Sequence, residues 1–284
     1  MIVVTGATGN VGRPLVHALA ATGLDVTAVS RNAPADRFAG AGESVRHHSA
    51  DLARAGGLRP ALDGADALFL HDTGAGAGLL DVQGILGAAK AAGVGRIVLL
   101  SSQGVATRPE SASHGGAGLS LEDAVRRSGV RWTILRPGGF ASNAYAWADS
   151  VRIHRTVAAP FADVGLPVID PADIAGVAAA ALREDGHAGN TYELTGPALS
   201  TPRQRARDLA EVIGEPITFV EQSRDEARTQ MLRFMPEAVV ETTLAILGGP
   251  TPAEQRISPV VEQLLGRPAR TFTEWAARNT GAFK

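Results

Sequence analysis

The sequence contains no cysteine, and its positive and negative charges nearly cancel. Without cysteine there is no disulfide bridge, no thiolate nucleophile and no cysteine metal site, which fits a protein of a reducing compartment. A formal net charge of -2 over 284 residues gives no electrostatic reason to expect nucleic acid or an anionic membrane as a partner. These absences favour a small-molecule ligand.

Long apolar runs are missing too. No run reaches the ~18 residues that a transmembrane helix requires, and no basic segment followed by an apolar one opens the chain. We therefore expect a cytoplasmic protein with no membrane partner, as a monomer or a homodimer. Lysine occurs only at Lys90 and Lys284, and the excess of arginine over lysine is typical of a GC-rich bacterial genome.

Short β-branched runs alternate with amphipathic helical patterns over the first half of the chain, as in parallel strands joined by crossover helices. This alternation predicts an α/β fold with a doubly wound parallel sheet, the Rossmann type, over residues 1–155. The expected strands are 2–5, 26–30, 45–48, 67–71, 97–101 and 132–135, and the expected helices are 11–21, 54–62, 80–92 and 120–127.

The alternation becomes irregular further on, and residues 156–284 are expected to form a smaller, mostly helical C-terminal cap that is interleaved with the sheet. Asp170-Pro171 and Thr201-Pro202 are typical helix starts. Ser223 and Glu226 form a capping-box pattern ahead of a helical region that runs to about residue 247. TYELTG and ITFVEQ are each expected to form a strand, the second at a sheet edge.

Glycines punctuate the turn after the first expected strand. Gly6, Gly9 and Gly12 spell GxxGxxG between an apolar strand and an amphipathic helix. A dinucleotide site needs one glycine at the tight turn, one where the backbone approaches the pyrophosphate and one where the helix packs on the strand. The pattern in this context predicts a dinucleotide-binding site.

The residues after the second and third strands indicate which dinucleotide binds. An NAD site usually has an acidic residue after the second strand, whereas this chain has Arg31, which can pair with a 2′-phosphate. We therefore expect NADP(H) to be preferred over NAD(H), although Arg31 can also be an ordinary solvated arginine. Asp51 follows the third strand, where a carboxylate can accept from adenine or can cap the next helix.

Polar residues end the fourth and fifth strands, at the carboxyl edge where open α/β sheets bind ligands. They are also residue types that form turns. The candidates at this edge are His71, Thr73, Ser101, Ser102 and Gln103.

Several segments in a fixed order resemble one known family. The turn TGATGNVG is followed by ADLARAGGLRPALDGADALFL, IVLLSSQG, SGVRWTILRPGGFASN, YELTGPALS and LLGRPARTFTEWAARN. Together they resemble the NmrA-like branch of atypical short-chain dehydrogenases, in particular its quinone oxidoreductases of type 2, over nearly the whole chain. The resemblance implies a Rossmann fold, NAD(P)H as cofactor and a reductase activity.

The resemblance also implies roles for individual residues. Asp51 and Leu52 would flank the adenine, and RPGGF would close over the nicotinamide through Pro137 and Gly138, unless it is a simple turn from strand to helix. The residues that would wrap the pyrophosphate are Gly6, Ala7, Thr8, Gly9, Asn10 and Val11.

The Tyr-x-x-x-Lys pair that many short-chain dehydrogenases use is absent, because neither Tyr145 nor Tyr192 is followed four positions later by lysine. A quinone can accept hydride without that pair, provided that the reactants are held close together and a proton is supplied. Our candidate acid is His114, since imidazole changes charge near neutral pH. A surface histidine in a glycine-rich loop is the alternative.

Aromatic and thioether side chains are expected to form a pocket for a flat apolar substrate between sheet and cap, although ordinary core packing explains the same residues. The predicted pocket consists of Phe140, Tyr145, Trp147, Met231 and Phe234, with Phe161 and Met235 beside them. No metal is expected, because His47 and His48 adjoin on a strand and point to opposite faces.

Two functions are compatible with these features. The first is an NADPH-dependent oxidoreductase that transfers hydride to a quinone or another conjugated apolar carbonyl compound. The second is a non-catalytic NADP(H)-binding redox sensor that regulates a protein partner, which the missing Tyr-Lys pair favours. The first is preferred because of Arg31 and the resemblance to quinone reductases.

Overall fold

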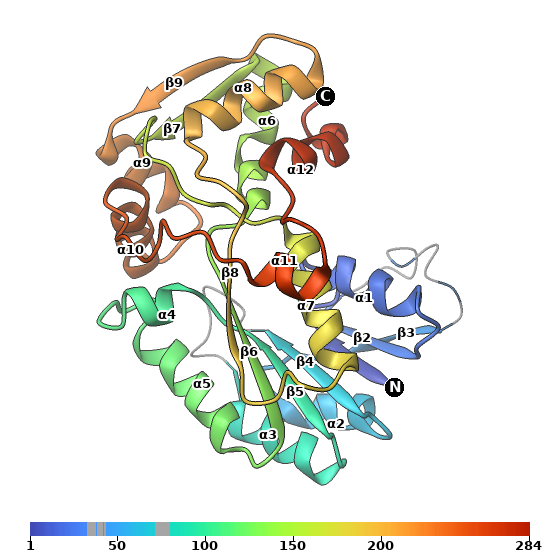
Figure 1. Ribbon diagram of the computed structural model, residues 1–284. Coiled ribbons are helices and arrows are strands. Elements are labelled where there is room, and N and C mark those ends of the chain that lie inside the picture. Colours follow the sequence, from blue (N-terminus) through green and yellow to red (C-terminus); the bar gives the residue numbers. More distant parts are fainter. Residues whose placement is uncertain (33–37, 39–41, 43, 72–79) are drawn as a thin grey trace. The chain divides into compact units, whose positions relative to one another are not determined.

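The larger sheet of the structure is parallel and seven-stranded, in a computed structural model that describes residues 1–32, 38, 42, 44–71 and 80–284 (Figure 1). The strand order is β3-β2-β1-β4-β5-β6-β8, and the pairings among β1 to β6 are all parallel. The strands are β1 (Ile2–Thr5), β2 (Val26–Ser30), β3 (Val45–Ser49), β4 (Ala67–His71), β5 (Arg96–Leu100), β6 (Arg131–Pro137) and β8 (Thr191–Leu194). The predicted Rossmann-type α/β fold is confirmed.

The strand order reverses next to β1. From β1 the chain adds β2 and β3 on one side, and it then returns to place β4 and β5 on the other side. In open parallel sheets such a reversal leaves a crevice at the carboxyl ends of the two strands, because their connecting helices lie on opposite faces. The glycine turn after β1 and His71 at the end of β4 therefore lie at this point of the sheet.

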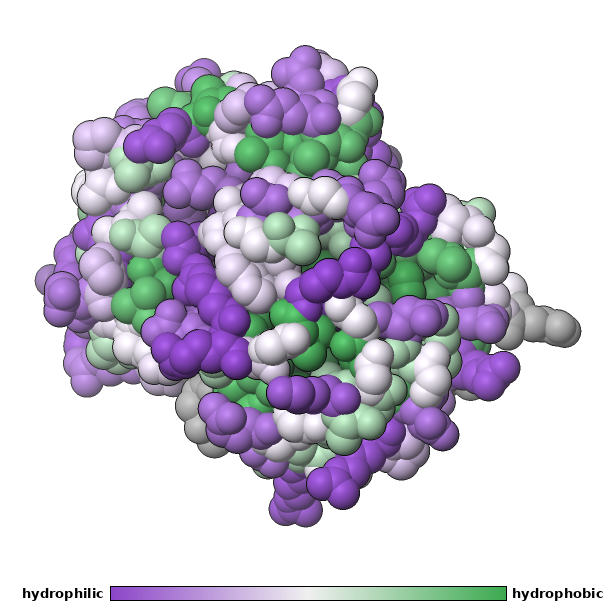
Figure 2. All heavy atoms as spheres, turned by 60° about the horizontal axis from the view of Figure 1, so that its bottom comes forward, coloured by the Kyte–Doolittle hydropathy of each residue, from purple (hydrophilic) through white to green (hydrophobic). Residues whose placement is uncertain are grey.

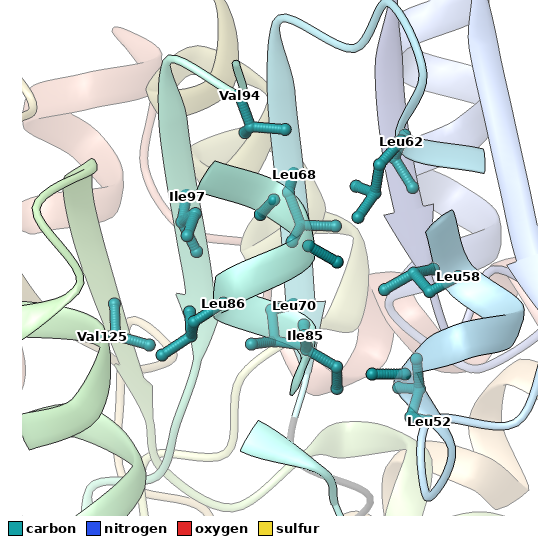
Figure 3. Packing of buried hydrophobic residues seen from close by; sticks show 14 of the residues in the cluster. Leu52, Leu58, Leu62, Leu68, Leu70, Ile85, Leu86, Val94, Ile97 and Val125 are labelled. Carbon is teal, nitrogen blue, oxygen red and sulfur yellow. The ribbon is translucent and has the colours of Figure 1, made fainter. Parts of the chain in front are cut away.

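Helices cover both faces of the sheet, which is why β1 and β2 are mostly apolar and are buried along their whole length. One face carries α1 and α7, which pack against each other. On the other face, leucines from the connecting helices are directed at Leu68, Leu70 and Ile97 of β4 and β5 (Figure 3). The helices of this part are α1 (Gly12–Ala20), the 3₁₀ helix η2 (Ala55–Leu58), α2 (Arg59–Leu62), α3 (Val82–Ala91), α4 (Gly104–Thr107), α5 (Gly116–Arg127) and α7 (Pro171–Arg183).

The chain divides into two compact units. The sheet unit comprises residues 1–110, 114–137 and 171–193, and the second unit comprises 111–113, 138–170 and 194–284. The chain passes from the sheet unit into the second unit after residue 137, and residues 171–193 return to the sheet unit. The return has a physical cause: α7 is apolar along nearly its whole length, and TYEL supplies β8 beside β6.

The second unit combines short helices with a two-stranded parallel sheet of β7 and β9. Its main core lies where α8 packs on α12, around Leu209, Trp275 and Phe283. A smaller cluster joins α9 to α10 around Leu244. The elements are η4 (Ala141–Trp147), α6 (Ala148–His154), β7 (Thr156–Pro160), α8 (Pro202–Ile213), β9 (Thr218–Gln222), α9 (Arg224–Met231), α10 (Glu237–Gly248), α11 (Val260–Leu265), α12 (Phe272–Arg278) and η5 (Thr280–Ala282).

Capping residues fix several helix starts in this unit. Ser223 and Glu226 form the expected capping box at α9, in which each side chain accepts a hydrogen bond from the backbone N–H of the other residue. Thr201 caps α8 in the same way. The helical region expected to follow Ser223 is two helices, because Pro236 has no N–H and serves as the N-cap of α10.

The helix expected at 54–62 is also shorter than predicted. It consists of one 3₁₀ turn and one α-helical turn, since Gly56 and Gly57 weaken the first and Pro60 lies in the first turn of the second.

The surface is mixed in character. Hydrophobic side chains occur in small areas between hydrophilic ones on the face that Figure 2 shows. No helix within the described part of the chain combines the length and apolar character needed to cross a bilayer.

Candidate functional site

The glycine turn after β1 is closed by its own backbone. Gly6 has a positive φ of 60°, and the N–H of Gly9 donates to its carbonyl oxygen over 2.9 Å. A Cβ at Gly12 would overlap that carbonyl and would lie 2.8 Å from the Cα of Ala7. Two of the three glycines are therefore required by the fold of the turn itself.

His71 explains part of the demand for glycine at position 6. A Cβ at Gly6 would overlap Nε2 of His71, so the imidazole lies directly against the turn. The backbone N–H of His71 donates to Oγ1 of Thr5 (3.3 Å), whose hydroxyl donates to the carbonyl of Phe69 (2.9 Å). The ends of β1 and β4 are thus joined by the Thr5 side chain as well as by the backbone hydrogen bonds between the two strands.

The beginning of α1 suits a bound anion. Val11 at the N-cap cannot cap the helix with its side chain, and the first turn of α1 contains no acidic residue. A helix N-terminus without an acidic or capping side chain presents N–H groups and a partial positive charge. The turn therefore fits the diphosphate of a dinucleotide. It is formed by the residues from Gly6 to Val11, which the sequence predicted to bind the pyrophosphate.

A cavity of about 390 Å³ lies beside the ends of β2 and β3. The hydroxyl of Ser49 donates to the carbonyl of Arg31 over 2.9 Å and so holds the backbone of that arginine. The lining residues are Arg31, Ser49, Ala50, Asp51, Arg54 and Gly57. Two arginines and the predicted adenine-side residue Asp51 therefore line one cavity.

Arg54 was not singled out from the sequence. It stands three residues after Asp51 and forms the N-cap position of η2. The available signal was a second arginine just beyond the third strand, but the abundance of arginine in this chain hides it. Asp51 does not cap η2 and instead accepts from the N–H of Ala53 (3.1 Å), while Leu52 is buried in the core of the sheet unit.

The ends of β5 and β6 are tied together. The N–H of Ser101 donates to the carbonyl of Leu135, and that of Gln103 donates to the carbonyl of Pro137 (2.8 and 2.9 Å). Ser102 accepts from the N–H of Gly104 over 3.1 Å and thus acts as a turn former. Ser101, Ser102, Gln103 and Pro137 therefore lie together at the carboxyl edge.

Ser101 has a second partner, which sequence reasoning did not assign. Its hydroxyl donates to Oε1 of Glu122 over 2.6 Å, and Glu122, on α5, is completely buried. Arg136 donates to both oxygens of the same carboxylate (2.9 and 2.6 Å), and Arg126 donates to Oε2 (2.8 Å). The carboxylate thus joins α5 to the ends of β5 and β6.

The protonation state of Glu122 follows from these contacts. Burial on its own would raise the pKa of the carboxyl group, but the hydrogen bonds from Arg136, Ser101 and Arg126 outweigh burial, and the pKa of Glu122 lies below its usual value. The pKa of Arg136 is raised by its hydrogen bonds to Glu122. The network is therefore ionised at neutral pH.

His114 also lies at this edge of the sheet. A Cβ at Gly104 would be 2.6 Å from Cδ2 of His114, so the imidazole packs on the backbone of the SSQG segment. The ring is partly buried. The structure thus brings the predicted acid close in space to the polar residues that end β5.

The residues predicted to line a substrate pocket are dispersed over the second unit. The Tyr145 hydroxyl donates to Asn279 over 2.5 Å, and its ring packs on Trp275 and Phe283. Trp147 joins the same core. Met231, with Phe161 and Met235, belongs to the cluster between α9 and α10.

Two further members of that set have other surroundings. Phe234 is 61% exposed, and Phe140 forms an isolated bridge with Ile169. Gly138, predicted near the nicotinamide, donates its N–H to the carbonyl of Leu194 (2.9 Å). Thr73 lies outside the described residues. Among those that are described, no group of His, Asp and Glu side chains could hold a metal ion.

The chain is similar over its whole length to several known proteins. Residues 6–185 match the model of the NAD(P)H-binding family. The chain is 38% identical over its whole length to a (4-alkanoyl-5-oxo-2,5-dihydrofuran-3-yl)methyl phosphate reductase of Streptomyces griseus, of which it covers 99%. It is 30% identical, with 100% of this chain and 99% of the relative covered, to an NAD(P)H azoreductase of Xenophilus azovorans.

A solved structure extends the likeness to three dimensions. An NADPH-dependent quinone oxidoreductase from Escherichia coli, in complex with NADPH, superposes with a TM-score of 0.80 at 27% identity. The match covers 99% of this chain and 100% of that one. The likeness therefore includes both units of the chain.

Proposed function

The chain belongs to the NAD(P)H-binding family and is an NAD(P)H-dependent reductase of the NmrA-like atypical short-chain type, and from this premise we propose that it transfers hydride from NADPH to a quinone or another conjugated apolar carbonyl compound. The observation that carries the proposal is the arrangement of three sites along the carboxyl edge of the sheet. A glycine turn fits a diphosphate, two arginines share a cavity beside it, and polar groups gather at the ends of β5 and β6.

The preference for NADPH is supported by the arginine cavity. A 2′-phosphate carries up to two negative charges, and guanidinium groups bind phosphate oxygens through paired N–H donors. Arg31 and Arg54 line the same cavity, and no acidic residue stands directly after β2, where an NAD site usually places one. Asp51 is present in the cavity but follows β3.

The acceptor class is supported by what the named relatives reduce. A quinone, an azo compound and a (4-alkanoyl-5-oxo-2,5-dihydrofuran-3-yl)methyl phosphate, which is a conjugated carbonyl compound with a phosphate group, are the acceptors in their names. Each contains an electron-poor π system that accepts hydride without prior protonation. Such an acceptor suits a chain that has no Tyr-x-x-x-Lys pair.

The reaction is a two-electron reduction. Transfer of hydride from NADPH to the acceptor would leave NADP⁺, and one proton added to the acceptor would complete its reduction. This chain holds the cofactor at the glycine turn and the arginine cavity, and His114 donates the proton from its place beside Gly104. Placing the reactants in contact provides most of the rate enhancement.

The test is a binding titration with NADPH, NADP⁺, NADH and NAD⁺, followed by NADPH oxidation in the presence of a benzoquinone, an azo dye and a butenolide. We expect tighter binding of the phosphorylated cofactors and turnover of at least one acceptor. Gly12→Val is the control, because its side chain would overlap the backbone of the turn.

Two results would contradict the proposal. Normal NADPH binding without oxidation by any acceptor of the panel would contradict the reductase activity on this class. If NADP⁺ and NADPH then bound with different affinities, the redox sensor would be favoured, since only unequal binding can shift a regulatory equilibrium.

A further inference from the structure

Glu122 links two strand ends that belong to the proposed NADPH site. Its carboxylate accepts from Ser101 at the end of β5 and from Arg136 near the end of β6. The side chain is completely buried, and Arg126 on the same helix completes the set of donors. One acidic group therefore joins side chains from two segments of the carboxyl edge, in addition to the backbone hydrogen bonds between them.

The polarity of the Ser101 hydroxyl follows from this contact. Serine has one hydroxyl proton, and at 2.6 Å from Oε1 that proton is directed at Glu122. The oxygen of Ser101 is left with lone pairs and can only accept from a further partner. A ligand group that meets Ser101 must therefore be a hydrogen-bond donor.

The nicotinamide half of NADPH carries such donors. Its ribose has hydroxyl groups and its carboxamide has an NH₂ group, whereas its phosphates offer only acceptors. The adenosine half has an amino group and a ribose hydroxyl too, but the arginine cavity that would bind that half lies at β2 and β3, on the other side of β1 from β5. The acceptor at Ser101 is therefore matched to this half of the cofactor.

A carboxylate is the side chain that fixes this polarity. An ionised carboxylate has no proton and only accepts, whereas a glutamine amide or a protonated acid can also donate to Ser101 and turn its hydroxyl outward. Arg126 and Arg136 both donate to Glu122 and favour its ionised form.

We propose that Glu122 is a positioning residue, which fixes the Ser101 hydroxyl as a hydrogen-bond acceptor for the nicotinamide half of NADPH. This role rests on the NADPH-dependent activity proposed above. A brace that only stabilised the fold would use the same contacts, so the two roles differ in whether the loss of the Ser101 contact weakens NADPH binding selectively.

The test compares NADPH dissociation constants of the wild type, Ser101→Ala, Glu122→Gln and the double variant. Loss of one hydrogen bond should weaken NADPH binding about five- to tenfold in Ser101→Ala. Glu122→Gln should have a similar effect, and the double variant should bind no more weakly than the weaker single variant, because both changes remove the same interaction.

A second ligand separates positioning from general damage. 2′,5′-ADP contains the adenine half but no nicotinamide ribose or carboxamide, so its dissociation constant should be unchanged in all three variants. Arg127→Gln is the matched control, because Arg127 pairs with Asp123 on the exposed side of the same helix. This control should leave the affinity for both ligands unchanged.

Glu122→Asp covers the case in which Glu122→Gln does not fold. Aspartate keeps the charge for the arginines but is one methylene shorter, so the contact to Ser101 is lost and NADPH binding should weaken as in Ser101→Ala. Unchanged NADPH affinity in Ser101→Ala, additive losses in the double variant, or equal losses for 2′,5′-ADP would overturn the proposal. A wild-type protein that does not bind NADPH would instead overturn the proposed function.

Discussion

The imidazole of His114 packs on the backbone of Gly104, at a separation that leaves no room for a side chain at position 104. Gly104 begins α4 directly after Ser101, Ser102 and Gln103. A histidine that the sequence places in a glycine-rich loop is thereby held at the carboxyl edge of the sheet. Because His114 lies at this edge, its proposed role as the proton donor can be tested by substitution.

His114→Gln should lower kcat about 100-fold, because loss of a general acid usually lowers the rate by at least about that factor. The dissociation constant of NADPH should stay unchanged. His154→Gln, an exposed substitution on α6, is the control and should change neither quantity. Gly104→Ala should resemble His114→Gln, because its Cβ would displace the ring. Full activity of His114→Gln would assign the proton to water.

Arg31→Ala and Arg54→Ala should each weaken NADPH binding about 10- to 100-fold, because hydrogen bonds to a charged phosphate are strong. NADH binding should change little, so that the ratio of the two affinities falls. Arg59→Ala, on α2 and outside the arginine cavity, is the control. An unchanged ratio in Arg31→Ala would refute the assignment of the 2′-phosphate.

Gly12→Ala should abolish measurable NADPH binding and lower the free energy of unfolding by about 1–3 kcal/mol, because its Cβ would overlap the Gly6 carbonyl. Gly87→Ala is the matched control. Gly87 is exposed in the middle of α3 with open space around it, so alanine should stabilise the fold by about 0.5–1 kcal/mol. Chemical denaturation of both variants measures these changes.

Stability in acid should depend on Glu122. Its pKa in the folded protein lies below the ordinary value of 4.5, so its ionised network stabilises the fold above that pH, and this contribution is lost as the pH falls through the lowered folded pKa. Thermal melts from pH 7 to pH 3 should therefore show the difference between the wild type and Glu122→Gln shrinking towards the acid end. A constant difference would mean that the carboxylate does not carry the effect.

Arg205 should be replaceable by methionine. Its guanidinium is buried against Trp147 and Phe272 at 5.6 and 6.0 Å from the ring centroids, and burial lowers its pKa to about 10. Burial of the charge destabilises the folded state, and removing the charge removes this cost. Arg205→Met should therefore leave Tm at pH 7 unchanged or higher. Arg205→Ala should lower Tm, because it also loses the packing of the side chain. A lower Tm for Arg205→Met would show that the charge itself stabilises the second unit.

Local patterns were sufficient to predict most of the sheet unit. The strands at Ile2–Thr5, Val26–Ser30 and Ala67–His71 lie where their apolar runs predicted them, because the burial of both faces of a parallel sheet leaves a continuous signal. The capping box at Ser223 was equally visible, since it depends on residues only three positions apart. The place of β8 was not visible, because pairing with β6 joins segments about 55 residues apart.

The sequence by itself determined the parallel sheet, the glycine turn and the place of Arg31 after β2, because each depends on neighbouring residues. The tertiary structure decided which distant residues share a site. Arg54 joined Arg31 in one cavity, His114 came to rest on Gly104, and Glu122 met Ser101 and Arg136. These contacts arise from the packing of helices and loops around the sheet, and no local spacing rule encodes them.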